Sequence, residues 1–405
     1  MAQAEVNIGM LGHVDHGKTA LTHALTGVWT DTHSEEIKRG ITIKLGYADA
    51  VFRKCPKCGE PQAFTTKEKC PKCGSATDVL RRVSFIDSPG HETLMTTAIA
   101  ASSVMDGALL VIAANEPCPQ PQTLEHLMVL DILGVKNVIV IQNKIDLVSR
   151  EKALENYNQI KKFLSGTVAE NAPVIPVAAN YFANLDLVIQ AIEKHIPTPK
   201  RDAGAPFRMY VARSFDVNKP GTDIDKLVGG VVGGSIIQGT VRVGDEIELR
   251  PGISRGAEKE GREPSHEPIV TRVESLSVGS ERLEEARPGG LVAIGTRLDP
   301  ALTKADSLVG NLVGKPGTLP ELVSEAELDF VLLKRVDLEN PPLRQNEPLV
   351  LSVGTTTAIG FVDKIKKNIL SLKLKRPICA KKGSKVALSR RLGQRWHLAG
   401  YGTLR

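Results

Sequence analysis

The first half of the chain alternates between short apolar runs and stretches with a helical repeat of apolar residues. An apolar run at residues 5–11 precedes a helical pattern at 18–25, and four later pairs keep this order. The later strands are predicted at residues 82–87, 108–113, 137–142 and 174–177, and the later helices at 92–105, 123–133, 151–164 and 185–195. Five strand-to-helix alternations predict an α/β domain with a mostly parallel sheet and helices on both faces.

The second half of the chain has a different pattern. A Pro-rich linker, PTPKRDAGAP at residues 197–206, separates the two halves. Residues 207–310 then form short apolar runs broken by glycines, which predicts a closed β-barrel. A second turn-rich stretch, GKPGTLP at 314–320, is followed by further strand patterns up to residue 405. We therefore predict an α/β domain at 1–200 and β-barrel domains at 206–314 and 322–405.

The amino-acid composition indicates the class of protein and its expected location. The chain has 405 residues, of which 41% are apolar and 24% charged, as in ordinary globular proteins. Its longest apolar run, residues 107–114, is far shorter than the roughly 20 residues that span a bilayer, so no membrane association is predicted. No signal-peptide pattern opens the sequence, and a cytoplasmic location is expected.

The net charge of +6 is unevenly distributed. Residues 364–405 contain 13 of the 52 Lys and Arg residues and none of the 46 Asp and Glu residues. The preceding residues therefore carry a charge of −7, and the basic end indicates an anionic partner such as nucleic acid. A solvated barrel exterior is the alternative. Aromatic residues make up only 4% of the chain, which disfavours extensive base stacking.

The loop after the first predicted strand carries a phosphate-binding pattern. Residues 12–19 read GHVDHGKT, which matches G-x-x-x-x-G-K-[ST] between a strand and a helix. Glycines let backbone N–H groups surround the phosphates, Lys18 neutralises their charge, and the Thr19 hydroxyl can bind Mg²⁺. The sequence therefore predicts a P-loop.

Three further motifs follow strands in the order of a GTPase. Residues 87–90 (DSPG) place Asp87 to hold Mg²⁺ through water and the Gly90 N–H to contact a γ-phosphate. Residues 143–146 (NKID) place Asp146 to accept from the guanine N–H groups that adenine lacks, and 177–180 (VAAN) offer backbone N–H groups to the guanine oxygen. The predicted GTP-binding residues are Asp15, His16, Gly17, Lys18, Thr19, Ala20, Asn143, Lys144, Asp146, Ala178, Ala179 and Asn180.

Two residues near these motifs each allow two interpretations. Thr42, in SEEIKRGITIKL at 34–45, can complete the Mg²⁺ shell when a γ-phosphate is present and leave it after hydrolysis. A plain strand residue is the alternative. His91, next to Gly90, can orient the attacking water or can be an ordinary loop residue. On the first interpretations, Asp87, Gly90 and His91 form the predicted catalytic group.

A cysteine-rich insertion interrupts this domain at residues 53–75. Cys55, Cys58, Cys70 and Cys73 form two C-x-x-C pairs, and four thiolates suit tetrahedral Zn²⁺. Unpaired surface thiols or an iron–sulfur cluster are the weaker alternatives. A site with four thiolates has no open position for catalysis, so a structural knuckle that holds a recognition surface is expected. The two remaining cysteines, Cys118 and Cys379, are interpreted as ordinary buried or half-buried thiols.

With these residues assembled, the chain resembles the translational GTPases of the elongation factor Tu type. The strings GHVDHGKT, RGITI and DSPGH carry that resemblance, and two following barrels match the class. Within it, the chain is similar to the gamma subunits of archaeal and eukaryotic translation initiation factor 2. The strings that carry the closer likeness are VNIGMLGHVDHGKTALTHALTGVWTDTHSEE, the cysteine insertion, NEPCPQPQTLEHL, RSFDVNKPGTDI, GGLVAIGT and LDP on either side of Arg297, and SRRLGQRWHLAGYG.

This resemblance implies that GTP-bound protein carries methionyl initiator tRNA to the small ribosomal subunit and releases it after partner-stimulated hydrolysis to GDP. It also implies a heterotrimer in which an alpha subunit docks on the second domain and a beta subunit on the GTPase domain. By position, Thr19 and Thr42 bind one Mg²⁺, and Asp15 and the Gly40 carbonyl bind a second. His91 takes the water-orienting role, and Tyr47 lies near the methionine carried by the tRNA.

Two positions depart from the family pattern. Ala178 stands where relatives usually have serine, so a hydroxyl contribution is lost and only a small loss of guanine affinity is expected. The third-domain hairpin at residues 330–349 is shorter than in relatives, which puts a partner contact there in doubt.

Three other functions are compatible with parts of the pattern. A selenocysteyl-tRNA elongation factor shares the GTPase and barrels but would be expected to continue beyond residue 405. A GTP-dependent metallochaperone would use the cysteines to transfer metal, but such proteins lack two appended barrels. A third possibility is a binding scaffold that hydrolyses almost no GTP until a partner acts. This differs from the GTPase interpretation only in its slow turnover.

Overall fold

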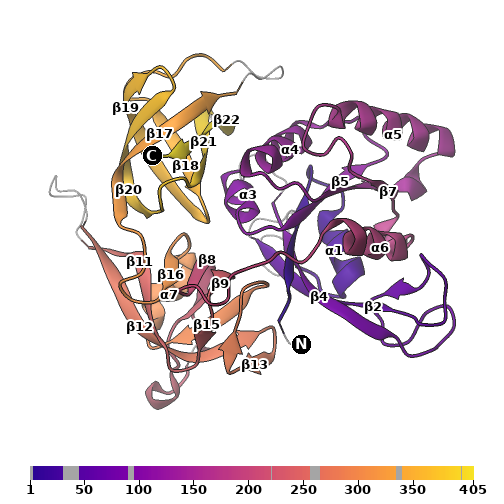
Figure 1. The fold of residues 1–405 in the computed structure, drawn as a ribbon, viewed down its shortest axis with the longest axis horizontal. Coiled ribbons are helices and arrows are strands. Elements are labelled where there is room, and N and C mark those ends of the chain that lie inside the picture. The colour runs from indigo at the N-terminus through magenta and orange to yellow at the C-terminus, as the bar shows by residue number, and fades with distance from the viewer. Residues whose placement is uncertain are drawn as a thin grey trace. The chain divides into compact units, whose positions relative to one another are not determined.

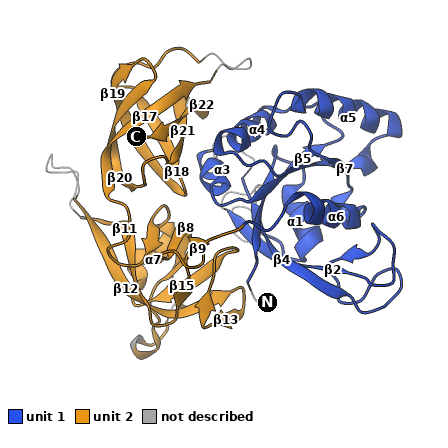
Figure 2. Cartoon of the chain, in the orientation of Figure 1, with its two compact units in different colours: residues 1, 3–199 blue, residues 2, 200–405 orange. Residues whose placement is uncertain are grey.

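The computed structural model describes residues 3–30, 45–89, 95–219, 221–255, 265–333, 340–393 and 395–405. The chain divides near residue 200 into two compact units (Figure 2). Gly40, Thr42, Gly90 and His91 lie outside the described residues, as does part of the hairpin at 330–349.

The first unit is built on one seven-stranded sheet in the order β3-β2-β4-β1-β5-β6-β7 (Figure 1). The strands β1, β4, β5, β6 and β7 pair in parallel, whereas β2 and β3 are antiparallel to their neighbours. The bounds are β1 Val6–Leu11, β2 Gly46–Lys54, β3 Phe64–Thr65, β4 Asp78–Asp87, β5 Gly107–Ala113, β6 Val138–Asn143 and β7 Val174–Pro176. The sheet is therefore mixed, with a parallel centre.

Helices cover both faces of this sheet. Every residue of β1, β5 and β6 is therefore buried. Side chains of α1 and α6 pack with alternate strand residues in the main apolar core, and α3 contacts α4. The helices are α1 Lys18–Thr26, α3 Met95–Ser102, α4 Pro121–Leu133, α5 Arg150–Leu164 and α6 Leu185–His195, with short 3-10 turns η2 Ile145–Leu147 and η3 Ala179–Tyr181. None of the described helices is long and apolar enough to cross a membrane.

The second unit begins with a barrel closed by pairing of β11 with β12, in the order β11-β16-β8-β9-β15-β12. The strand β13 extends it beside β12, and β10 pairs with β14 separately. The bounds are β8 Arg208–Phe215, β9 Val231–Gln238, β10 Val241–Arg242, β11 Glu246–Arg255, β12 Ser265–Val278, β13 Glu281–Leu283, β14 Glu285–Ala286, β15 Val292–Thr296 and β16 Leu312–Gly314. The turns η4 Ile224–Lys226, α7 Pro300–Thr303 and η6 Lys304–Asp306 lie in its loops.

The last barrel closes where β22 pairs with β17, in the order β17-β20-β19-β18-β21-β22. Its alternate residues, among them Leu328, Leu351 and Leu372, form a separate apolar core. The bounds are β17 Leu322–Leu332, β18 Pro348–Val353, β19 Thr356–Lys366, β20 Ile369–Cys379, β21 Lys385–Leu392 and β22 Arg395–Leu404. The predicted fold class, an α/β domain followed by two β-barrels, is confirmed.

Candidate functional site

The loop from β1 to α1 takes a shape that only glycine permits at two points. Gly12 and Gly17 have φ angles of 137° and 89°. A Cβ atom at Gly12 would lie 2.2 Å from the Val111 carbonyl oxygen, and one at Gly17 would lie 2.3 Å from Asn143 Nδ2. The loop is therefore pressed against the carboxyl ends of β5 and β6, where ligands of such sheets bind.

The first turn of α1 presents a cation and a hydroxyl at this edge. Lys18 is buried, and its Nζ donates to the His13 carbonyl at 2.6 Å. The Thr19 hydroxyl donates to Asp87 Oδ2 at 2.7 Å. No acidic residue lies in the first turn of the helix. A helix N-terminus with a lysine beside it favours an anion such as a phosphate.

Asp87 ends β4 and is fully buried. Its Oδ2 accepts hydrogen bonds from two hydroxyls, Thr19 and Thr30, each at 2.7 Å. A carboxylate beside a threonine hydroxyl is an oxygen-rich arrangement of the kind that Mg²⁺ prefers. These residues therefore fit the group that the sequence predicts here.

Asn143 joins two of the predicted motifs through its side chain. It ends β6 and is 2% exposed. Its Nδ2 donates to the His16 carbonyl of the P-loop at 2.9 Å, and its Oδ1 accepts from the Ala179 N–H at 3.1 Å. Three loops that are far apart in sequence are thus held at one edge of the sheet.

The remaining predicted guanine-side residues lie on the loops that Asn143 connects. Lys144 adopts a φ of 60°, and Asp146 is exposed in η2. Ala178 and Ala179 are buried after β7, whereas Asn180 is exposed. An exposed carboxylate beside buried backbone N–H groups can accept hydrogen bonds from a base while the loop donates to it.

The other predicted residues have simpler settings. Asp15 is exposed at the tip of the P-loop with a φ of 59°. Ala20 packs against the apolar core. Tyr47 is half-buried on β2 opposite Ile86 of β4. None of these three settings identifies a ligand by itself.

The structure adds a buried polar group that the sequence did not single out. His126 on α4 is 1% exposed, and burial lowers its pKa to about 3, with the charges of Lys18 and His13 adding to this effect. Its ring is therefore neutral at neutral pH and places no second charge beside Lys18. The His16 ring of the P-loop is also buried, with Nδ1 3.0 Å from the Val111 carbonyl and Nε2 3.3 Å from Glu116 Oε2. The sequence carries no clear signal for His126, because other polar residues of α4, Gln122, Thr123 and Glu125, are buried as well.

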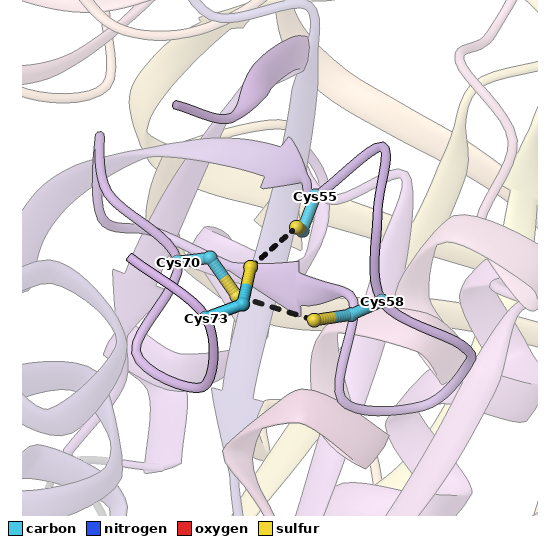
Figure 3. A group of neighbouring side chains, drawn as sticks. All are labelled: Cys55, Cys58, Cys70 and Cys73. Atoms are coloured by element: carbon cyan, nitrogen blue, oxygen red, sulfur yellow. Dashed lines mark hydrogen bonds between the residues drawn. The ribbon is translucent and has the colours of Figure 1, made fainter. Parts of the chain in front are cut away.

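The four cysteines of the insertion converge on one point (Figure 3). The Sγ atoms of Cys55 and Cys73 lie 3.5 Å apart, and those of Cys58 and Cys70 lie 3.7 Å apart. All four lie within 4.8 Å of one another. An ion with bonds of about 2.3 Å to sulfur in a tetrahedron places its ligands about 3.8 Å apart, so the cluster fits a closed tetrahedral site.

The backbone of the insertion supports this cluster with little apolar packing. Its own core consists of Cys55, Ala63 and Cys70, with Cys58 packed against them. The Cys70 N–H donates to the Ser75 carbonyl at 2.8 Å, and the Ser75 hydroxyl and N–H lower the pKa of Cys73 to about 6. Donors that lower a thiol pKa favour the thiolate that a metal binds.

The structure also describes the backbone beside the cluster and the burial of the two remaining cysteines. Gly74 adopts a φ of 71°, as a tight turn after Cys73 requires, whereas Gly59 does not have a positive φ. Cys118 is half-buried and Cys379 is buried, which confirms their interpretation as ordinary thiols. Burial raises the pKa of Cys118 to about 12 and that of Cys379 to about 11, so both are unreactive at neutral pH.

Comparison with known families accounts for most of the chain. Residues 3–198 match the elongation factor Tu GTP binding domain, residues 229–311 match elongation factor Tu domain 2, and residues 324–404 match the C-terminal domain of initiation factor eIF2 gamma. The chain is 59% identical to translation initiation factor 2 subunit gamma of Pyrococcus furiosus, over all of this chain and 98% of that protein. It is 57% identical to the corresponding subunit of Methanothermobacter thermautotrophicus, over all of this chain and 99% of that protein.

Solved structures with a similar fold include two elongation factors. A bacterial selenocysteine-specific elongation factor EF-Sec superimposes with a TM-score of 0.75 at 25% identity, covering all of this chain and 58% of that one. SelB from Methanococcus maripaludis, in complex with a GTP analogue, superimposes with a TM-score of 0.73 at 22% identity, covering 80% of that chain. The identities are less than half of those to the initiation factors.

The GTPase domain, the C-terminal domain and the full-length matches lead to the same family. The chain belongs to the translation initiation factor 2 gamma subunits, and it is a GTP-dependent initiation factor with a translational GTPase domain.

Proposed function

We propose that the edge formed by the P-loop, Asn143 and the Ala179 turn is the GTP site. The observation that carries this proposal is the pair of hydrogen bonds from Asn143 to His16 and Ala179. In this assignment residues 15–20 bind the phosphates. Asp146 accepts from the guanine N–H groups, Lys144 flanks the base, and residues 178–180 meet the guanine oxygen.

The same edge has the oxygens for Mg²⁺. Thr19 would bind the ion with Thr42, and Asp87 would act through water, while Asp15 and the Gly40 carbonyl would bind a second ion. Mg²⁺ when bound neutralises negative charge on the phosphate oxygens. Support comes from the 2.7 Å contact between Thr19 and Asp87 and from the exposed position of Asp15.

For hydrolysis we assign His91 to orient the attacking water and the Gly90 N–H to contact the γ-phosphate, near Asp87. Asp87 is anchored by Thr30 as well as by Thr19, so its carboxylate is held at the end of β4. A fixed carboxylate needs no reorganisation during the reaction. Turnover is expected to be slow until a partner acts.

The biological role that we propose is carriage of methionyl initiator tRNA to the small ribosomal subunit, with release after GTP hydrolysis. The full-length matches to initiation factor 2 gamma subunits support it. We further propose a cytoplasmic heterotrimer with alpha and beta subunits, bound by the second domain (206–314) and the GTPase domain (1–200). The third domain (322–405) carries the basic end of the chain, and Tyr47 would lie near the carried methionine.

For the insertion we propose a structural Zn²⁺ site made by the four cysteines. A core of three small buried residues and one partly buried cysteine is too small to hold residues 53–75 in one conformation, so a metal is needed. Nothing in the cluster is placed for phosphate chemistry, and all four sulfurs would be used as ligands.

The guanine assignment is tested by changing Asp146→Asn. An amide cannot accept from both guanine N–H groups, so GTP should bind about 10- to 100-fold more weakly while xanthosine triphosphate gains affinity. Unchanged GTP affinity in this variant would contradict the assignment.

The carrier role is tested with the GTP-analogue form of the protein at fixed salt, with an alpha subunit added if affinity is weak. Methionylated initiator tRNA, the same tRNA without methionine and an elongator aminoacyl-tRNA are compared. Preference for the first supports carriage of initiator tRNA. Equal binding of all three, or none, would point to a GTPase scaffold with another ligand.

A further inference from the structure

A groove of about 820 Å³ lies beside the cysteine insertion, on the first unit. Its walls are the last turn of α1, the strand β3 with the residues that follow it, and the first turns of α6. Apolar side chains contributed by all three walls line it: Leu25, Phe64, Pro71, Phe182, Leu185 and Ile189. A concave surface with this lining is suited to a bulky apolar side chain.

Aromatic residues stand at one end of the groove. Trp29 stacks on the ring of His23 with centroids 4.2 Å apart and 13° between the planes, and Phe182 meets the same ring edge-on at 6.3 Å. Trp29 is 55% exposed, Phe182 57% and the neighbouring Tyr181 72%. Exposed aromatic side chains at an apolar groove, here Trp29 and Phe182, are typical of a protein-binding surface.

The charge of the groove comes from the insertion. Residues 54–75 contain five lysines and two glutamates, Glu60 and Glu68. Both glutamates are already paired, Glu60 with Lys54 at 2.6 Å and Glu68 with Arg53 at 3.6 Å.

The two lysines that line the groove, Lys67 and Lys72, have no ion pair with the carboxylates that the structure describes. Asp186 is the one acidic side chain among the described lining residues, and its Oδ1 accepts from the Leu187 N–H. The side of the groove formed by the insertion therefore carries positive charge that no described carboxylate neutralises.

We propose that this groove docks an acidic, amphipathic segment of a partner protein. A bulky apolar side chain of the segment lies between Phe64 and Leu185, and its carboxylates pair with Lys67 and Lys72. A protein is favoured over single-stranded RNA because the floor is apolar and one face of the Trp29 ring is already covered by His23. The proposal does not depend on the carrier role.

Two elements belong both to the groove and to the candidate nucleotide site, so docking would affect nucleotide binding through them. The helix α1 begins with Lys18 and Thr19 and ends at the groove. Phe182 follows the turn that contains Ala179, whose N–H is held by Asn143. The same groove thus connects the insertion with both ends of the candidate GTP site.

The test uses the full chain with Trp396→Phe, so that Trp29 is the one remaining tryptophan. The probe is a 16-residue helical peptide with leucines at i, i+3, i+4 and i+7 and glutamates at most other positions. The same peptide with lysine for glutamate and a ten-nucleotide oligouridylate are the comparison ligands. Trp29 emission reports binding, and nuclear magnetic resonance shifts locate it.

The acidic peptide should bind saturably and shift resonances of the groove. The double variant Lys67→Glu and Lys72→Glu should weaken it by about tenfold, whereas Lys57→Glu, an exposed lysine of the same insertion outside the groove, should change it less than about twofold. Metal content and GTP affinity of each variant show that the fold is intact. No saturable binding of the acidic peptide, equal loss in both variants, or preference for oligouridylate would overturn the proposal.

Discussion

The substitution Asn143→Ala removes the side chain that connects the P-loop with the turn after β7. Its amide makes two hydrogen bonds to buried backbone groups, the His16 carbonyl at 2.9 Å and the Ala179 N–H at 3.1 Å. The side chain is 2% exposed, so water does not replace these partners without a local opening of the loops.

Each buried group left without a partner costs about 1–3 kcal/mol, so the variant should lose about 2–4 kcal/mol when both loops are held in the binding geometry. In the free protein the loops can relax toward water, but they must be reordered when a nucleotide binds. The dissociation constants for GDP and GTP should therefore both rise by about 30-fold or more. Equilibrium titration and stopped-flow dissociation of a fluorescent GDP analogue measure this effect.

Asn156→Ala is the matched control. Asn156 is 4% exposed on α5 and also makes two hydrogen bonds, accepting from Gln142 Nε2 at 3.0 Å and donating to the Glu116 carbonyl at 2.9 Å. It contacts neither of the two loops through these bonds, so it should lower stability while nucleotide affinity changes less than about threefold. Unchanged affinity in Asn143→Ala, or an equal loss in both variants, would refute the assigned role of Asn143.

Three further outcomes are expected. Chelation should remove about one zinc per chain and expose the cysteine cluster to thiol reagents, with GTP affinity within about threefold; an equal loss of nucleotide binding would mean that the insertion supports the GTPase fold. Because the pKa of His126 falls from 6.5 to about 3 on folding, the unfolded state alone gains a proton below pH 6.5. Stability should fall by about 2 kcal/mol between pH 7.5 and 5, and urea unfolding of His126→Leu should lack that part; an identical pH dependence would contradict its burial as a neutral ring. Arg81→Met removes a buried guanidinium that pairs with half-buried Glu193 at 2.7 Å and donates to the Ile192 and Ile196 carbonyls, and it should cost about 3 kcal/mol in thermal unfolding. Arg53→Met, paired with a largely exposed glutamate, should cost under about 1 kcal/mol, and equal costs would contradict the account.

Much of the fold was predictable because its strands and helices carry strong local patterns. The predicted helix at 185–195 matches α6, and the predicted strand at 108–113 matches β5 within one residue. The strand β2 was not predicted, since three of its four buried positions are the small residues Gly46, Ala48 and Ala50, and only Phe52 is large, while Tyr47 and Val51 on the other face are half-exposed. Hydrophobic alternation is weak in such a strand.

The site was predictable as motifs but not as contacts. The NKID pattern identified Asn143, but not its hydrogen bond to His16. These residues lie 127 positions apart, and only the order of the strands in the sheet brings them together. His126 was missed because α4 is buried on several sides, with polar Gln122 and Thr123 buried beside it, so no polar face distinguished it. The groove along the insertion depends on how α6 packs against β3, which no local pattern records.

The central claim is that the nucleotide state controls tRNA carriage. The most direct measurement is the dissociation constant of methionylated initiator tRNA with GDP and with a non-hydrolysable GTP analogue, at one salt concentration. The account predicts clearly tighter binding in the GTP-analogue state. Equal affinity in both states would contradict it.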